Sequence, residues 1–375
     1  MALIEPMKKL LFFFMICLTA YSQSVANASS VTDDAQEHES SGKFNAGNFI
    51  IDHIVDSYEW HIATIGQTHI SIPLPVILVD EGKFIVFSSS RFHGGTESYK
   101  GYKIETARSF NKGKIVKVIP GTMETDVAAN KPLDFSITKT VAGIFISVLL
   151  LIIIFMGVAK AFKRNSGHAP TGVQSLFEPL IIFIRDEVAK PSIGKHYQRF
   201  LPFLLTLFFF IFFNNLIGLI PLFPGGANVT GNLGVTLVLA FVTLLVTNFS
   251  GNKSYWLHIF DPPGIPWWLK FPIPLFLIIE LTGVFVKPFV LMIRLFANMV
   301  AGHIIILGFI SLIFIFASMG AGLAYSVSPL SIVFAVFIGL LELLVSFIQA
   351  YVFTLLSAIY IGMATEEHHE GEHVK

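Results

Sequence analysis

The sequence predicts an all-α polytopic membrane protein. Four features make up this prediction: about five transmembrane helices, a long inclined C-terminal hairpin, an amphipathic surface helix and a small β-rich extramembrane N-terminal insert. Apolar residues make up 54% of the chain and charged residues only 13%, which is typical of a membrane protein rather than a soluble domain. The net charge of zero argues against nucleic acid as a partner. A single cysteine, Cys17, offers neither a disulfide nor a metal cluster.

Residues 1–28 have the features of a secretory signal peptide. Lys8 and Lys9 precede the short apolar run LLFFFMICL, and Ala26-Asn27-Ala28 forms an A-x-A cleavage site. The apolar run is shorter than the roughly 20 residues that a span requires, but an uncleaved first transmembrane helix is the alternative. Either Met1 or Met7 could be the start, and cleavage itself is left open.

Residues 29–135 are predicted to form an extension outside the membrane. Residues 29–43 are polar and acidic without periodicity, which indicates disorder. Apolar residues at helical spacing then predict an amphipathic helix over 44–64. Short alternating runs from His69 to Pro120, separated by Gly and Pro, predict a β-rich structure. This insert, at about 44–130, is assigned no chemistry.

The membrane domain is expected over residues 136–366. Its first three spans are predicted at 136–159, 200–220 and 233–250. The segment 173–190 carries too many charges to span and is predicted to be an amphipathic helix lying on the surface.

The connecting loops alternate in charge. The loop 160–199 is strongly basic, the loop 221–232 has no charge, and the next loop contains Lys253 and Lys270. Because basic loops stay in the cytoplasm, the extension is expected outside and the tail, 367–375, inside.

Two further apolar elements, 272–318 and 329–363, exceed ordinary spans. At 1.5 Å per residue the first would be about 70 Å long, against a hydrocarbon core of about 30 Å. It must therefore break or lie steeply inclined, and the stretch SMGAGLAYSVSP predicts the turn between the two. An inclined hairpin can follow a neighbouring cylinder, with close approach permitted by small residues, namely Gly283, Ala297, Ala301 and Gly302.

Arg294 stands inside a segment that otherwise reads as lipid-soluble. A charge at this depth costs about 3 kcal/mol on insertion scales, so it is expected to be functional or held by protein. The alternative is a structural clamp that binds backbone carbonyls or a lipid head group. Glu280 and Lys287 share one stripe with Arg294 because they are spaced by seven residues, and they could equally snorkel or pair with each other. Asn298 follows one turn later.

Folding the two long elements into an antiparallel hairpin brings polar residues to equal depth. A turn centred near Gly322 places Arg294 at the same depth in the membrane as Gln349, and His303 at the same depth as Glu342. Titratable groups inside a membrane typically mark proton relays, although a buried pair that serves only packing is the alternative.

Two adjacent asparagines precede the uncharged loop. Asn214 and Asn215, in FFNNLIGLIP, could line a wet cavity, while ordinary interhelical hydrogen bonding is the favoured reading.

The stretch IRLFANMVAGH, followed by LELLVSFIQAYVFTLLSAIYIGMA, resembles subunit a of F-type ATP synthases. The resemblance covers about 136–366. It implies that Arg294 is the essential arginine, Asn298 the motif asparagine and Gln349 the glutamine that accompanies the arginine. His303 and Glu342 fall on two polar channel positions that the enteric bacterial protein fills as glutamate and histidine.

The resemblance implies proton translocation through two half-channels against a ring of c subunits, with Arg294 between them. The implied partners are the c ring, the b subunits of the peripheral stalk, the rest of the synthase and membrane lipid. The subunit would be non-catalytic by itself, would carry no cofactor or metal, and would lie in a bacterial inner membrane. Coupling to H⁺ or Na⁺ stays open.

Two other classes of function compete with this reading. A stand-alone ion-coupled secondary transporter would show an inverted repeat, and the sequence has none that we detect. A purely structural membrane anchor would leave the depth-matched charges unexplained. Co-purification with small c subunits and soluble catalytic subunits would separate both from a synthase subunit.

Overall fold

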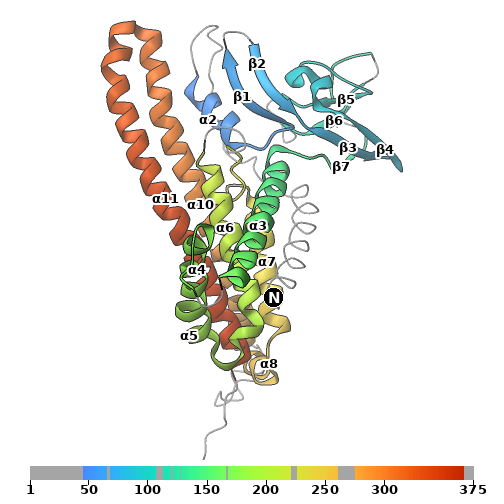
Figure 1. Cartoon of the computed structure of the whole chain (residues 1–375). Coiled ribbons are helices and arrows are strands. Elements are labelled where there is room, and N and C mark those ends of the chain that lie inside the picture. The colour runs from blue at the N-terminus through green and yellow to red at the C-terminus, as the bar shows by residue number, and fades with distance from the viewer. Residues whose placement is uncertain are drawn as a thin grey trace, which may run out of the picture.

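The computed structural model describes residues 45–65, 68–106, 113–119, 121–126, 128–165, 168–220, 226–260 and 275–366. Within these ranges, a tall set of helices carries a β-rich unit at one end, beside the start of α3 (Figure 1). The predicted fold class is confirmed. The expected signal peptide 1–28, the acidic stretch 29–43, Lys270 and the tail 367–375 lie outside the described residues.

The β-rich unit begins with α2 (Ala46–Ile54) and contains three small antiparallel sheets. Their strand orders are β1-β2, β4-β3-β7 and β5-β6. The 3₁₀ segment η1 (Ser89–Gly95) follows β4. The strands are β1 (Glu59–Ile65), β2 (Thr68–Pro73), β3 (Pro75–Asp80), β4 (Lys83–Ser88), β5 (Tyr102–Ile104), β6 (Ile115–Lys117) and β7 (Leu133–Asp134).

The helix predicted over 44–64 is wrong beyond Ile54. The chain leaves the helix at Asp56, whose carboxylate accepts hydrogen bonds from the Ser57 N–H (3.0 Å) and the Thr140 N–H (2.9 Å). Such side-chain bonds to the backbone compete with helix continuation. Residues 59–65 then pair with β2, and Trp60 is 3% exposed. The sheet contact therefore overrides the helical spacing of the apolar residues.

One face of β3 forms the core of the β-rich unit. Val76 and Leu78 are fully buried and pack with Phe92 of η1 and Tyr102 of β5. The Tyr102 hydroxyl donates to Asp80 Oδ2 at 2.6 Å. Burial, followed by the hydrogen bond and charge of Asp80, raises the pKa of Tyr102 above its ordinary value.

Four helical segments of the described residues are long and apolar enough to cross a membrane, or five if α7 and α8 form one span across their 103° bend. Helix α6 is the buried centre of this part. Its Phe209 ring lies 4.7 Å from that of Phe155 in α3, and its Phe208 ring lies 5.8 Å from that of Phe347 in α11. The helices are α3 (Lys139–Arg164), α6 (Tyr197–Gly218), α7 (Leu233–Phe249), α8 (Lys253–Phe260), α10 (Leu275–Met319) and α11 (Ala321–Thr365).

The segment between α3 and α6 is helical but interrupted. It consists of α4 (Val173–Phe183), a π-helical turn η2 (Ile184–Ala189), α5 (Lys190–Ile193) and η3 (Gly194–His196). Phe177 and Ile184 join the core on one side, whereas Leu176 on the other side is 65% exposed. This two-sided burial fits an amphipathic helix, and its position along the membrane surface stays a prediction.

Helices α10 and α11 form the expected hairpin, but its turn is shorter than predicted. Only Gly320 interrupts the helical residues, with φ 150°, and Pro329 lies inside α11 rather than in the turn. Each helix has 45 residues and would measure about 68 Å. The hairpin tip rises to the level of β1 and β2, and α2 packs on α10 there, with the Phe49 and Phe314 rings 6.1 Å apart (Figure 1).

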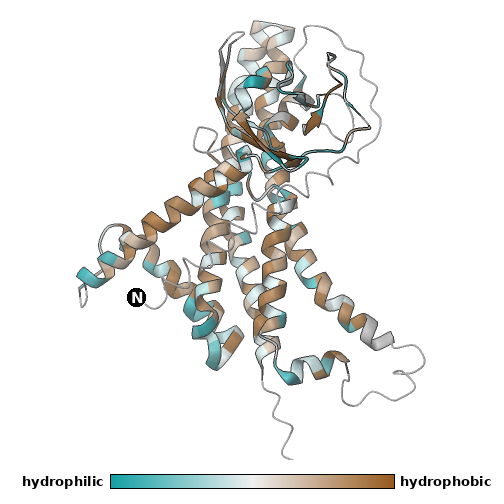
Figure 2. Cartoon of the chain, turned by 90° about the vertical axis from the view of Figure 1, so that its right-hand side faces the viewer, coloured by the Kyte–Doolittle hydropathy of each residue, from teal (hydrophilic) through white to brown (hydrophobic). Residues whose placement is uncertain are grey.

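The hairpin leaves much apolar surface uncovered. In the most apolar windows of α10 and α11 only 11% and 17% of residues are buried, against 78% in the segment 173–218. Figure 2 shows hydrophobic residues, in brown, along the helices below the β-rich unit. The hairpin therefore presents a surface for lipid or for another protein.

Candidate functional site

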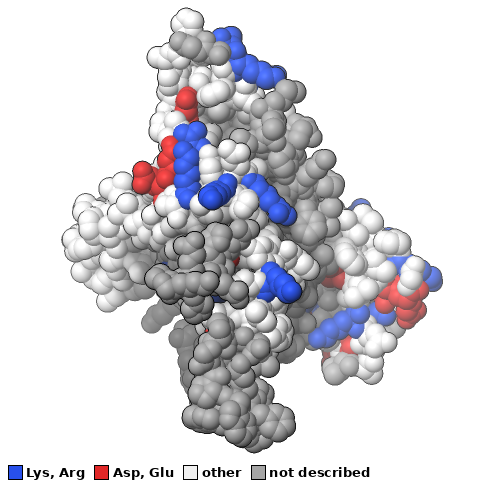
Figure 3. Space-filling view, turned by 90° about the horizontal axis from the view of Figure 1, so that it is seen from below, with Lys and Arg blue, Asp and Glu red and all other residues white. Residues whose placement is uncertain are grey.

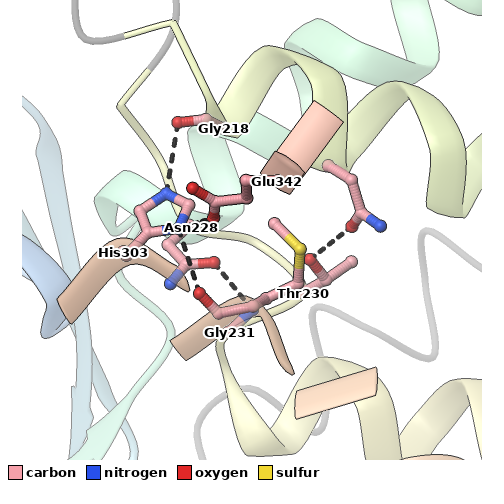
Figure 4. Close-up of polar contacts among 8 residues, drawn as sticks. Gly218, Asn228, Thr230, Gly231, His303 and Glu342 are labelled. Atoms are coloured by element: carbon pink, nitrogen blue, oxygen red, sulfur yellow. Dashed lines mark hydrogen bonds and ion pairs between the residues drawn. The ribbon is translucent and has the colours of Figure 1, made fainter. Parts of the chain in front are cut away.

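His303 of α10 and Glu342 of α11 are in direct contact. The Nδ1 atom of His303 lies 2.7 Å from Glu342 Oε1, and their side chains are 15% and 3% exposed. Nδ1 also lies 3.0 Å from the Met299 carbonyl, and Nε2 lies 3.3 Å from the Gly218 carbonyl of α6 (Figure 4). The hairpin alignment predicted this pair, and the structure brings the two side chains together.

The surroundings of the His303 ring consist of hydrogen-bond acceptors. A neutral imidazole donates from only one nitrogen, whereas an imidazolium donates from both. An imidazolium can donate to the acceptors at both nitrogens, and a neutral ring can donate from Nε2 to the Gly218 carbonyl while Nδ1 accepts from a protonated Glu342. The shared proton can therefore reside on either the histidine or the glutamate.

Gly302 lets the Glu342 carboxylate lie against the backbone of α10. A Cβ atom at this position would lie 2.7 Å from both Cδ and Oε1 of Glu342, closer than such contacts allow. From the sequence, Gly302 is one of the small residues expected to face a neighbouring cylinder. The structure instead shows Gly302 in contact with Glu342 inside the hairpin. Ala297 and Ala301, the alanines of that set, are exposed.

Buried polar side chains continue from this pair into α6 and the loop after it. Asn215 is fully buried, donates from Nδ2 to the Ser346 carbonyl of α11 (3.4 Å) and accepts at Oδ1 from the Thr230 hydroxyl (2.6 Å). Asn214 donates to the Phe210 carbonyl at 2.7 Å. Asn215 thus makes the expected interhelical bond, whereas Asn214 bonds within its own helix.

Several buried polar atoms of this region have no hydrogen-bond partner among the described residues. They are Asn214 Oδ1, Asn228 Nδ2, Ser346 Oγ and Glu342 Oε2, while Glu342 Oε1 has His303 as its contact. Asn228 Oδ1 is occupied by the Gly231 N–H at 2.9 Å (Figure 4). Orphaned polar atoms in a buried region are places where water binds.

Sequence reasoning missed Asn228, Thr230 and Ser346. The first two stand in the uncharged loop 221–232, where polar residues read as an ordinary turn, and serine is common in membrane helices. Their burial, at 4% exposure or less, was the missing information.

Arg294 lies on an exposed side of α10, one helical turn from the exposed Asn298. Among the described residues it makes no hydrogen bond and no ion pair, and none joins it to Gln349, which is 6% exposed on α11. Leu291, three residues before it, and Leu295, the next residue, are 1% exposed. Arg294 therefore lies at the edge of the buried side of α10, with an exposed side chain.

Lys287 and Glu280 lie on the same helix, toward its start. The Lys287 ammonium lies 5.6 Å from the centre of the Tyr360 ring of α11, and Lys287 lines a small pocket with Tyr255 and Thr247. No ion pair joins Lys287 to Glu280 in the described part of the chain.

The end of the molecule opposite the β-rich unit carries many cations. Figure 3 views this end from below and shows Lys and Arg side chains on it. The exposed cations at the ends of these helices are Lys160, Lys163, Arg164, Lys190, Lys195, Arg199 and Lys253.

Comparison with known proteins gives two regions of similarity. Residues 142–362 match the family described as ATP synthase A chain, and residues 49–135 match a domain of unknown function. The chain is 35% identical to ATP synthase subunit a 2 of Prosthecochloris aestuarii over 359 residues, which cover 94% of this chain and 90% of that protein.

Two further relatives match a shorter part of the chain. It is 47% identical to ATP synthase subunit a 2 of Chlorobaculum tepidum over 250 residues, 64% of this chain and 67% of that protein. It is 39% identical to ATP synthase subunit a of Myxococcus xanthus over 265 residues, 68% of this chain and 80% of that protein.

Proposed function

The chain belongs to the ATP synthase A chain family, and from this premise we propose that it translocates protons in the membrane sector of an F-type ATP synthase. It acts as a subunit of the rotary complex and is not catalytic by itself. The observation that carries the mechanism is Arg294, a permanent charge on the exposed side of an apolar helix, which makes no hydrogen bond and no ion pair with the described residues.

The partner of the exposed hairpin surface is a ring of c subunits. Ala297 and Ala301, within two helical turns of Arg294, are small and exposed, so a cylinder could approach closely there. The exposed apolar side chains around them also support a protein contact. The b subunits, the rest of the synthase and membrane lipid are the other expected partners.

Arg294 would act on an acidic side chain of that ring. At 4 Å and an effective dielectric constant of 20, the attraction between guanidinium and carboxylate is about 4 kcal/mol, or about three pKa units before desolvation is subtracted. The carboxyl group would therefore release its proton beside Arg294, and the fixed positive charge would bar a direct proton leak. Asn298 and Gln349 would orient the two groups by hydrogen bonds.

His303 and Glu342 would deliver protons to this point from the external side. Support comes from their contact, from the acceptors around the imidazole, and from the orphaned polar atoms of Asn214 and Asn228, which would hold a file of water. Glu280 and Lys287, nearer the start of α10, are the candidates for the second half-channel.

The orientation in the membrane follows from charge. The cations at the lower end would lie in the cytoplasm, together with the C-terminus, and the β-rich extension would lie in the periplasm of a bacterial inner membrane. Residues 1–28 would serve as the signal peptide that directs the extension there.

Replacing Arg294 with lysine tests the mechanism. Lysine can lose its proton in a dry site whereas a guanidinium cannot, so Arg294→Lys should abolish proton-driven ATP synthesis while assembly is kept. Arg185→Lys, a partly exposed cation that is paired with Asp186, is the matched control and should keep synthesis. Coupled synthesis by Arg294→Lys near the wild-type rate would overturn the proposal, as would purification of the chain without a ring of small subunits.

A further inference from the structure

One face of the sheet β4-β3-β7 is apolar and uncovered. Phe84 and Leu133 both pair with Val79, and Val86 pairs with Ile77, so these side chains share one face. Phe135, two residues after Leu133, continues the face and donates its N–H to the Ile77 carbonyl. We name this set the sheet face: Ile77, Val79, Phe84, Val86, Leu133 and Phe135.

The sheet face is not the core of the β-rich unit. The opposite side of the same strands, with Val76 and Leu78, is fully buried against η1, β5 and β6. By contrast, Phe84 is 78% exposed, Leu133 63%, Val86 60% and Phe135 48%. A contiguous apolar surface of this kind on an extramembrane unit marks an interaction site.

The sheet is tied rigidly to the point where α3 begins. Phe135 precedes Lys139 by four residues, so at most about 14 Å of extended chain separates the sheet face from the first residue of that span. The Ile137 N–H donates to the Pro75 carbonyl (3.0 Å), and the Lys139 N–H donates to the Ser57 carbonyl (2.8 Å). The sheet therefore cannot move far from the end of α3.

The arrangement in space gives the direction of the sheet face. Figure 1 shows η1, β5 and β6 on the upper side of β3 and β4, while α3 begins below these two strands. Figure 2 shows brown strands where the β-rich unit meets the helices. The side of the sheet away from its core is thus the side nearest the lipid around α3, whose Leu149 and Ile153 are 60% and 58% exposed.

We infer that the sheet face rests on the lipid bilayer, at the surface where α3 enters it. Aromatic and aliphatic side chains insert at the boundary between head groups and acyl chains. The inference requires only that α3 spans the membrane, so it stands or fails separately from proton translocation.

The accessibility of single sites in the assembled complex tests this inference. In a Cys17→Ser background, Phe84→Cys and Leu133→Cys receive a nitroxide label, and the complex is placed in vesicles of phosphatidylethanolamine and phosphatidylglycerol. Glu97→Cys and Met123→Cys, also exposed in the β-rich unit but outside the sheet face, are the controls. All four side chains are exposed, so no core contact is removed.

Electron paramagnetic resonance then compares collisions of each label with oxygen, which concentrates in lipid, and with a water-soluble nickel chelate. A several-fold higher oxygen-to-nickel ratio at positions 84 and 133 than at 97 and 123 is expected. Equal ratios at all four sites would overturn the inference. Exclusion of both reagents at 84 and 133 would also overturn it, because a protein segment would then cover the face.

Discussion

The His303 imidazole of α10 lies 2.7 Å from the Glu342 carboxylate of α11 and 3.3 Å from the Gly218 carbonyl of α6. Three helices thus meet at one ring. Since the two ring nitrogens face only acceptors, the ring and the carboxylate together are suited to hold and pass a proton. This relationship is the basis of the first two predictions.

Neutralising Glu342 should slow proton flux without uncoupling the enzyme. Glu342→Gln removes the carboxylate that faces His303 Nδ1, so ATP-driven acidification of inverted vesicles, followed with a pH-sensitive dye, should become slower. The exchanged variant, His303→Glu with Glu342→His, retains both groups and should recover much of the flux. Unchanged flux in both Glu342→Gln and His303→Ala would mean that the pair serves packing alone.

A single added methyl group at Gly302 should have a similar effect. The new Cβ would lie 2.7 Å from Glu342 Oε1, so the flexible carboxylate would shift away and the contact with His303 would be lost. Assembly should be kept, with a slower flux close to that of Glu342→Gln. Gly308→Ala on the same helix is the control, because a Cβ there meets nothing within 4 Å in the described chain. Equal flux in the two alanine variants would contradict the prediction.

Asp56 should stabilise the first turn of α3 from outside the helix. Its carboxylate accepts the Thr140 N–H at 2.9 Å, and removing a group that caps a helix start costs about 1 kcal/mol. Hydrogen exchange of the full chain should show faster exchange at the start of α3 in Asp56→Ala. Asp126→Ala, which removes bonds only to Ala128 and Ala129, should leave α3 unchanged. The same exchange rate at α3 in both variants would rule out this role.

The ion pair of Asp80 and Lys117, at 2.7 Å, should make the β-rich unit sensitive to acid. Burial alone would raise the pKa of Asp80, but hydrogen bonds from Lys117 and Tyr102 outweigh it and lower the pKa. A lowered folded-state pKa means that the stabilisation is complete above the unfolded value of about 4 and is lost as the pH falls through the folded value.

Asp80→Asn tests this dependence. The β3 amides should exchange faster in Asp80→Asn than in the wild type at neutral pH. The difference should shrink as the pH falls from about 4 toward the lowered folded-state pKa, at which the wild-type carboxylate takes up a proton. Glu81→Gln, at an exposed neighbour that also faces Lys117 at 3.6 Å, is the control and should change the exchange little. A difference that is the same at every pH would exclude the ion pair as its cause.

The sequence by itself determined the fold class, the hairpin and the depth matching of His303 with Glu342. These properties follow from apolar runs and from the constant rise of a helix, both of which are local and can be counted along the chain. The same counting failed at residues 59–65, where helical spacing gave way to pairing with β2, and at the turn, where Pro329 was tolerated inside α11.

Only the tertiary structure decided which polar groups are buried together. In the sequence Asn228 and Thr230 are ordinary loop residues, and Gly218 offers only a backbone carbonyl. In the structure Asn228 and Thr230 are buried, Thr230 bonds to Asn215 of α6, and the Gly218 carbonyl lies beside His303 of α10. The sequence suggested that Gly302 allows a neighbouring protein to approach closely. In the structure, the missing side chain of Gly302 leaves room for the Glu342 carboxylate. Such relationships join segments distant in the chain, and their energy depends on burial and close packing, which no local pattern of residues specifies.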